Sequence, residues 1–438
     1  MAGRLGAFGL IVVLVTSISG VAGPGAANAA TSPVATDNER AQIVQRSMMA
    51  FNIDLEYVRL VDASADSDSG DIGVPISPDE HQEMQRRRAL GAHAPTIDAA
   101  FDKETTYAGS WMSQSEGGVL HVAFTSTPSA GQRALLNSLL SPTEQFVTST
   151  GAQSLAALEA TQTQVTADLS SRDLPLVASS IDIPGNSVVV TIAVDAPANE
   201  EQIVTQRYKN VKIETKRGLV NTTDGSRDIR SGRVYGGEWI SSNQGFRCTN
   251  TYTDAKSATN ETYGLSAGHC GPIGTTWVQG LGGTRYIGTV HTNGTFGHSS
   301  TICDCAAIGP TPIPGYGTNQ VLVNNNNLFT YTRTGSPYVG EVACHSGAAS
   351  FELKGVIQCA TIGDIHATSY ECDPNGGNCF SLFDAIRLPV FATSGDSGGP
   401  LGDGGSFLGL LSGGGTNDNY FSKALNVNQI NLTLSYAS

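Results

Sequence analysis

No cysteine precedes Cys248 in this chain of 438 residues, and all eight cysteines lie in the second part of the sequence. Charge is also scarce, since Asp, Glu, Lys and Arg together make up 15% of the residues. Basic residues are the minority, 25 against 39 acidic ones, and the net charge is -14. Such an acidic chain is a poor partner for nucleic acid or for an anionic membrane surface. Glycine, in contrast, is abundant with 51 residues, which is typical of a loop-rich β protein.

Long apolar runs are missing beyond residue 30. The run at residues 5–15 follows the basic Arg4 and precedes the small residues Ala27-Asn28-Ala29. It falls short of the ~20 apolar residues of a membrane-spanning helix, which is the competing interpretation. This pattern predicts a secretory signal peptide over residues 1–29. We therefore expect a secreted, extracellular product.

The cysteine-free residues 30–230 predict an α+β pro-region in two parts. Residues 40–93 have a polar, helical pattern, and Arg86–Arg88 are expected on a solvated helix surface. Residues 107–213 mix strands and helices. They include a strand at 118–124, a helix at 154–169 and a hairpin at 181–194 that turns at Gly185-Asn186.

The stretch 222–236 is polar and is predicted to be an exposed linker that is open to proteolysis. Beyond it, residues 231–438 alternate short β-rich segments with Gly, Asn and Ser turns. The expected fold class is all-β, a double antiparallel β-barrel, with 424–434 as the one candidate for a long helix.

The most specific motif is Gly395-Asp396-Ser397-Gly398-Gly399-Pro400. Glycines on both sides let the backbone turn sharply, so that the N–H groups of Gly395 and Ser397 point at one spot. Such a turn can stabilise a developing oxyanion beside a serine nucleophile. Ser397 is unreactive as an ordinary hydroxyl, however, and needs a base within hydrogen-bond reach.

His269 is the candidate base, because an imidazole can accept a proton near neutral pH. A carboxylate must orient that imidazole. Asp304 is the preferred candidate, since the apolar run behind it predicts burial. Asp364 and Asp384 stay open as alternatives, whereas Asp373 stands in a Cys-rich turn that favours a surface loop.

On these motifs the chain resembles the bacterial secreted chymotrypsin-like serine proteases, the streptogrisin and α-lytic protease group. The order His, Asp, Ser along the chain is the chymotrypsin order. The resemblance covers residues from about 233 to 438, and the matching segments are Gly236-Gly237, Cys248, Ala267–Cys270, Asp304, Cys344–Gly347, Gly395–Pro400 and Leu411–Gly414.

The resemblance implies a double β-barrel with the active site between the barrels, and a pro-region that assists folding and inhibits the protease. It implies His269 as base, Asp304 as orienting carboxylate and Ser397 as nucleophile. The segment Ser412, Gly413 and Gly414 would then pair with an extended substrate backbone as an added strand.

Disulfides are expected, because an even number of cysteines in an exported chain favours them. The resemblance implies Cys248 with Cys270 and Cys344 with Cys359. Cys372 and Cys379 suit a short loop bridge, whereas Cys303 and Cys305 flank Asp304 in a strained arrangement and keep open partners. A zinc site on these last four cysteines is the competing interpretation, but no Cys-x-x-Cys pair or histidine cluster supports it.

The group often has a cysteine shortly before the nucleophile that pairs with one after the Ser-Gly-Gly strand, and this chain has neither cysteine. His345 is a second departure from the group's pattern. His345 stands where a cation usually follows the cysteine, and we hypothesise that protonated His345 pairs with Asp396. Phe391, six residues before the nucleophile, takes the pocket-floor position, where an aspartate selects Lys or Arg. Phe391 therefore favours an apolar or aromatic P1 residue.

The sequence thus predicts a secreted serine endopeptidase that acts on protein or peptide substrates through an acyl-enzyme. It is expected to be made as an inactive preproenzyme, to need no cofactor and no metal, and to be a monomer. The alternative is a protease-shaped binding module without catalysis, which an intact His, Asp and Ser set disfavours. Biological ester hydrolysis is a third possibility, since acyl-enzyme chemistry permits both.

Overall fold

The computed structural model describes residues 34–64, 74–141, 144, 146–170, 176–193, 200–208, 210–216, 227, 233–283, 285–311, 318–323, 328–372, 379–415 and 417–436. The predicted signal peptide at 1–29 lies outside the described residues. The chain divides into two units, Met1–Ala35 and Thr36–Ser438, and the helices and strands of the described residues belong to the second.

Three capped helices begin this unit: α1 (Asp37–Met48), α2 (Leu55–Asp62) and α3 (Pro78–Gly91). Thr36 and Ser77 start α1 and α3 with capping boxes. In each box the cap hydroxyl accepts from the N–H of the third helical residue, a glutamate, whose side chain accepts from the N–H of the cap residue. The expected helical range 40–93 is therefore occupied by separate helices, followed by α4 (Ala94–Phe101).

The α+β part consists of two strand groups with helices packed against them. β1 (Tyr107–Ser113), β2 (Val119–Phe124) and β3 (Phe146–Thr150) form one sheet. The remaining elements are the 3₁₀ turn η1 (Gln114–Glu116), α5 (Ala130–Leu139), α6 (Leu155–Ser170), β4 (Leu176–Asp182), β5 (Ser187–Ala193), α7 (Glu200–Arg207) and β6 (Val211–Lys216). Strands β4 and β5 form the predicted hairpin, and Asn186 in its turn has a left-handed φ of 46°.

The all-β part begins with an eight-stranded sheet in the order β25-β9-β10-β14-β12-β11-β7-β8. Its core buries the apolar face of these strands, including Leu265 and Trp277. The strands are β7 (Trp239–Ser242), β8 (Arg247–Thr249), β9 (Tyr252–Lys256), β10 (Thr262–Ser266), β11 (Thr276–Gln279), β12 (Tyr286–Asn293), β14 (Ala306–Ile308) and β25 (Thr433–Leu434).

A second sheet of twelve strands carries the rest of this part, and its main path is β19-β18-β22-β23-β24-β21-β20-β4-β5-β6. The strands of the all-β part in this sheet are β18 (Val342–His345), β19 (Gln358–Thr361), β20 (Asp364–Cys372), β21 (Cys379–Leu388), β22 (Pro400–Asp403), β23 (Ser406–Gly415) and β24 (Asp418–Lys423). Short strands β13 (Ser300–Thr301) and β17 (Arg333–Thr334) join this sheet, while β15 (Gln320–Leu322) and β16 (Leu328–Thr330) form a separate pair.

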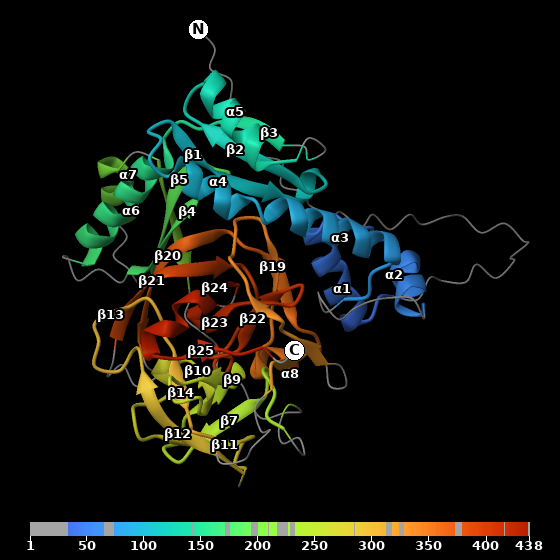
Figure 1. Ribbon diagram of the computed structural model, residues 1–438, viewed down its shortest axis with the longest axis vertical. Helices are drawn as coiled ribbons and strands as arrows, with labels where there is room; N and C mark the ends of the chain where they lie inside the picture. The colour runs from blue at the N-terminus through green and yellow to red at the C-terminus, as the bar shows by residue number, and fades with distance from the viewer. Residues whose placement is uncertain are drawn as a thin grey trace, which may run out of the picture. The chain divides into compact units, whose positions relative to one another are not determined.

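The hairpin β4–β5 continues this second sheet, although it lies far earlier in the sequence (Figure 1). Strand β20 pairs antiparallel with β4 through Thr368 opposite Ser179 and Ser369 opposite Ala178. The Asp364 carboxylate also accepts a 2.6 Å hydrogen bond from the Ile181 N–H. The N-terminal region is thus attached to the all-β part by a shared sheet.

Helix α3 supplies a second attachment and corrects one expectation. The Arg88 guanidinium forms an ion pair with Asp403 of β22 at 2.5 Å, and both side chains are nearly buried. Arg87 is buried as well and donates to the Met49 carbonyl at 2.6 Å. Only Arg86 of the three has the predicted solvated position, because Arg87 and Arg88 reach acceptors in neighbouring elements.

The exposed-linker prediction for 222–236 is wrong at several positions. Arg227 and Val234 are fully buried, Gly236 is buried as well, and Arg233 is exposed. Residues 222–226 and 228–232 lie outside the described residues. Polar composition did not reveal the burial, because the Arg227 side chain finds buried acceptors that are remote in sequence.

Helices within the all-β part are short. α8 (Ala348–Lys354) was not predicted, and the expected helix at 424–434 is the 3₁₀ segment η3 (Ala424–Ile430). Among the described residues, no helix has both the length and the apolar character needed to cross a membrane.

Three disulfides are present in the described part of the chain. Cys248 is bonded to Cys270 and Cys344 to Cys359, the pairing that the resemblance implied. The open pair is also settled, because Cys303 is bonded to Cys305. Both precede β14 and lie outside any strand, so the backbone can turn between them. Cys379 is disulfide-bonded too and stands opposite Cys372, whose side chain lies outside the description.

Candidate active site

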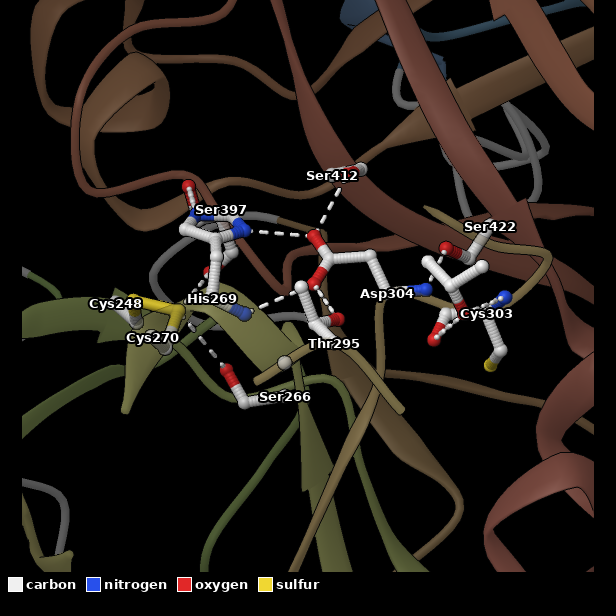
Figure 2. Close-up of polar contacts among 12 residues, drawn as sticks. Cys248, Ser266, His269, Cys270, Thr295, Cys303, Asp304, Ser397, Ser412 and Ser422 are labelled. Atoms are coloured by element: carbon white, nitrogen blue, oxygen red, sulfur yellow. Dashed lines mark hydrogen bonds and ion pairs between the residues drawn. A yellow bond between two sulfur atoms is a disulfide. The ribbon is translucent and has the colours of Figure 1, made fainter. Parts of the chain in front are cut away.

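His269 and Ser397 meet although they come from different sheets. His269 lies on the 3₁₀ turn η2 (Gly268–Cys270), directly after β10 of the eight-stranded sheet. Ser397 lies in the glycine-rich turn before β22 of the twelve-stranded sheet. The His269 Nε2 atom is 2.9 Å from the Ser397 hydroxyl oxygen (Figure 2). This is hydrogen-bond reach for a proton transfer from hydroxyl to imidazole.

Asp304 holds the other side of the imidazole. Its Oδ2 atom is 2.6 Å from His269 Nδ1, and its Oδ1 atom accepts the His269 backbone N–H at 2.8 Å. Two hydroxyls also donate to this carboxylate at 2.6 Å, from Thr295 and Ser412 (Figure 2). The carboxylate therefore fixes both the position and the tautomer of the ring.

The surroundings of Asp304 keep its carboxylate charged. Its side chain is completely buried, and burial alone would raise the pKa. The His269 imidazole and the donors Ser412 and Thr295 outweigh that effect, so the pKa of Asp304 lies below its ordinary value. A charged, buried carboxylate beside the imidazole is suited to stabilise an imidazolium.

Gly268 is required by this arrangement. A Cβ atom on Gly268 would lie 2.3 Å from the Thr295 hydroxyl and 2.9 Å from Asp304 Oδ1. Any other residue would push apart the contacts that hold the carboxylate. The Cys248–Cys270 disulfide secures the residue that follows His269.

The turn around Ser397 depends on glycines with left-handed backbone. Gly395 has a φ of 100° and Gly398 a φ of 85°, which other residues adopt only with strain. The Trp239 ring packs against Gly395, where a Cβ would lie 2.3 Å from it. Within the part of the chain that the structure describes, the N–H groups of Gly395 and Ser397 donate no hydrogen bond. These two donors are thus available to an oxyanion.

The hypothesis of a His345–Asp396 ion pair is wrong. His345 is fully buried, and burial, assisted by Arg227, lowers the pKa of its imidazole to about 3. Neither imidazole nitrogen has a hydrogen-bond partner among the described residues. Asp396 instead accepts the N–H groups of Ser350 and Thr393 at 2.9 Å each, and burial raises its pKa to about 6.

The alternative carboxylates lie elsewhere. Asp364 accepts from Ile181, and Asp384 contacts His366 at 2.7 Å and Lys423 at 2.5 Å. Asp373 lies outside the described residues. Asp304 is therefore the aspartate that the structure brings to His269.

Of the residues expected to bind substrate, Ser412 contacts this group directly. Ser412, Gly413 and Gly414 belong to β23, and the Ser412 hydroxyl points at Asp304. The carboxylate of Glu371 lies against Gly413, where a Cβ would be 2.1 Å from Oε2. Phe391 is partly exposed, and the Lys354 ammonium lies 4.4 Å from its ring centroid.

Comparison with known proteins then identifies the family. No family model matches the chain. Serine protease 2 of Streptomyces fradiae is 31% identical over 191 residues, which cover 42% of this chain and 96% of that protein. The chain belongs to the streptogrisin group of chymotrypsin-like serine proteases. The predicted fold class, a double β-barrel after an α+β region, is thereby confirmed for this protease.

Other matches cover similar shares of this protease's length. Streptogrisin-A of Streptomyces griseus is 29% identical over 187 residues, or 42% of this chain and 53% of that protein. The solved chymotrypsin of Cellulomonas bogoriensis is 23% identical and covers 47% of this chain and 100% of its own, with a TM-score of 0.37. The solved Nocardiopsis protease is 25% identical and covers 46% of this chain and 99% of its own, with a TM-score of 0.36.

The sequence analysis missed three contributions to the site of this protease. Thr295 had no motif to mark it, because it reaches Asp304 through the fold of the loop before β14. Ser412 was singled out for substrate binding, and its hydroxyl contact with Asp304 came only from the structure. Glu371 was also missed, since a lone glutamate in a strand carries no signal of its own.

Proposed function

We propose that this serine protease is an exported endopeptidase in which Ser397 is the nucleophile, His269 the general base and Asp304 the orienting carboxylate. The Ser397 oxygen attacks the peptide carbonyl carbon while its proton passes to His269 Nε2. The carbonyl oxygen becomes an oxyanion, which accepts from the Gly395 and Ser397 N–H groups. His269 then gives its proton to the departing amine, and an acyl-enzyme remains.

Water completes the cycle by the same groups in reverse roles. His269 takes a proton from the water as it attacks the acyl-enzyme, and then returns a proton to Ser397 as the carboxylic acid leaves. The observation that carries this proposal is the continuous contact from the Ser397 hydroxyl through His269 to Asp304, at 2.9 Å and 2.6 Å.

The decisive test is covalent labelling of the mature, folded protein with a fluorophosphonate probe. We expect one equivalent of label on Ser397 and none on Ser397→Ala. The Ser266→Ala variant is a matched control, since Ser266 lies nearby but its hydroxyl donates to the Thr249 carbonyl. Absence of labelling in a folded protein would favour a binding module. Comparison of peptide and ester turnover separates a protease from an esterase.

We propose further that residues 1–29 direct export and that residues 30–230 are a pro-region that inhibits the protease as its own intramolecular partner. Two contacts support this role: the shared sheet between β4 and β20, and the Arg88–Asp403 ion pair. Both attach the N-terminal region to strands of the protease sheet that carries Ser397.

For specificity we propose an apolar or aromatic P1 residue. Phe391 supplies an aromatic ring where an aspartate would select basic residues. The ammonium of Lys354 over that ring adds a positive charge that disfavours Lys and Arg. Digestion of a peptide library tests this, and dominant cleavage after Lys, Arg, Asp or Glu would contradict it.

A further inference from the structure

Arg227 occupies a place that its sequence context does not suggest. Its side chain is completely buried, although it lies in the polar stretch before the all-β domain. Burial of a guanidinium is costly unless its donors find acceptors. The structure provides acceptors for both Nη atoms, and they all come from residues beyond 233.

The guanidinium donates to four oxygens of the protease domain. Nη1 lies 2.7 Å from the Ser346 hydroxyl, 3.1 Å from the Gly237 carbonyl and 3.4 Å from the Gly347 carbonyl. Nη2 lies 3.2 Å from the Leu322 carbonyl. The Phe351 ring stacks on the guanidinium at 3.8 Å from its centroid.

The backbone of Arg227 is held as well. Its N–H donates to the Glu352 carboxylate at 3.1 Å, and its carbonyl accepts from the Trp239 N–H at 3.3 Å. Gly237 must be a glycine here, since a Cβ on it would lie 2.8 Å from Nη1 of Arg227. The site is therefore shaped around this one residue.

Through Ser346 and Gly347, Arg227 is connected to Asp396, the residue before the proposed nucleophile. Its guanidinium holds Ser346 and Gly347, and Gly347 lies directly against Asp396. A Cβ on Gly347 would be 2.2 Å from Asp396 Oδ1. Displacement of the Ser346–Gly347 segment would therefore move the turn that carries Ser397.

Arg227 is also connected to Gly395. Glu352 accepts both the Arg227 N–H and, at 2.7 Å, the Trp239 indole N–H. The Trp239 ring packs on Gly395, whose N–H is one of the two proposed oxyanion donors. Arg227 thus supports the turn that carries Ser397 both at Asp396 and at Gly395, without touching the reacting atoms.

We propose that Arg227 is a positioning residue of the mature protease and that the bond cut in maturation lies on its N-terminal side. This inference rests on the proposed zymogen and on the proposed oxyanion hole. Removal of Arg227 with the pro-region would take from the buried Gly237 carbonyl the donor that it has among the described residues, and one of two donors from each of the Leu322 and Gly347 carbonyls. This inference moves the proposed end of the pro-region, which composition alone puts at residue 230, to a point before Arg227.

The first test determines the N-terminus of the active, secreted enzyme by Edman sequencing and intact mass. We expect a first residue numbered 227 or lower. An enzyme that begins after residue 227 and labels fully with the fluorophosphonate would overturn this inference and leave the proposed function intact. A folded enzyme that does not label at all would instead overturn the proposed function, and the positioning role with it.

The second test measures kcat and KM for Arg227→Met and Arg227→Lys, with Arg233→Met as the matched control. Arg233 is an exposed arginine nearby. Rates are expressed per site titrated by the fluorophosphonate, so that losses in folding do not enter. For R227M we expect kcat to fall roughly tenfold to a hundredfold with KM changed less than about twofold, because small displacements of catalytic groups cost that much.

R227K should retain part of kcat, and R233M should match the wild-type enzyme. If R227M yields too little mature protein, Arg227→Ala assayed with added guanidinium ion replaces it, and the ion should restore kcat. Wild-type kcat in R227M, or loss in R227A that guanidinium does not restore, would overturn the positioning role.

Discussion

At the scale of single residues, the carboxylate of Asp304 makes more contacts than any motif indicates. It accepts from the His269 backbone and ring and from two hydroxyls. With these donors in place, the imidazole has one orientation and one tautomer. Loss of the negative charge should therefore remove catalysis while substrate binding persists.

Asp304→Asn is expected to lower kcat about 10⁴-fold, because the amide would favour the wrong imidazole tautomer. KM should change little, since Asp304 is buried away from the substrate. Asp384→Asn is the control, because Asp384 was the competing candidate and contacts His366 and Lys423 instead. Equal losses in both variants would contradict the assignment. The measurement is steady-state hydrolysis of a peptide amide.

Glu371 gives the cleft a carboxyl group that titrates near neutrality. Burial raises its pKa to about 7, while the neighbouring His269 opposes the shift. A carboxyl with a raised pKa is neutral below pH 7 and charged above it. The group lies against Gly413, on the strand proposed to bind substrate.

We therefore expect selectivity for lysine two to four residues before the cleaved bond to rise between pH 6 and pH 8. The gain over an isosteric norleucine should be about fivefold, corresponding to one partly exposed ion pair. Glu371→Gln should abolish this rise. The measurement is kcat/KM for paired peptides at both pH values, and a pH-independent ratio in the wild-type enzyme would refute the prediction.

Site residues that stand in a local motif could be predicted from the sequence, and those that act through remote contacts could not. His269 and Ser397 stand in short glycine-containing motifs, so their chemistry and order were visible. Thr295, Glu371 and Arg227 act through contacts with residues remote in sequence, which no local pattern encodes. The His345 hypothesis failed because sequence shows neighbours along the chain and not the burial of a ring beneath Gly399.

At the scale of elements, helix α3 shows what composition cannot distinguish. Its three consecutive arginines read as a charged surface, yet each has a different environment. Arg86 is half exposed and pairs with Glu83 of its own helix, whereas Arg88 pairs with Asp403 of β22. Helix α3 therefore attaches the N-terminal region to the protease sheet.

Arg88→Met should therefore destabilise the full chain by about 3 kcal/mol, since it removes the cation that faces the buried Asp403 carboxylate and its neighbour Glu341. Arg86→Met should cost less than about 1 kcal/mol, as is usual for an exposed pair. Urea unfolding of the two variants in a Ser397→Ala background, which prevents self-digestion, measures the difference. Equal effects would argue against a structural role for the Arg88 contact.

The strands were easier to predict than their partners. The hairpin of β4 and β5 was visible from its alternation and its Gly185-Asn186 turn. Its antiparallel pairing with β20 joins residues nearly two hundred positions apart, and sequence gives no register for such a contact. The double-barrel class could be predicted from composition and family motifs. The shared sheet could not, because it depends on contacts between strands remote in sequence.

At the scale of the whole molecule, maturation should depend on the protein's own active site. If the enzyme cuts its own pro-region, the Ser397→Ala chain should accumulate after export at full length less the signal peptide. The wild-type chain should give a shorter product that contains Ser397. Mass spectrometry of the culture medium measures both. A processed S397A chain would mean that another protease performs the cut.

The proposed maturation would also change the sheet that carries Ser397. While β4 is bound, the backbone donors and acceptors of Thr368 and Ser369 are covered. When β4 departs, β20 becomes a rim of the sheet and offers that open hydrogen-bonding row to any extended chain, including another copy. Asp364 then regains water, and its pKa, raised by burial in the intact chain, returns toward normal. The Asp364 carboxylate then lies at the open rim of every copy, and repulsion between these negative charges should discourage fibrous self-association of the free enzyme.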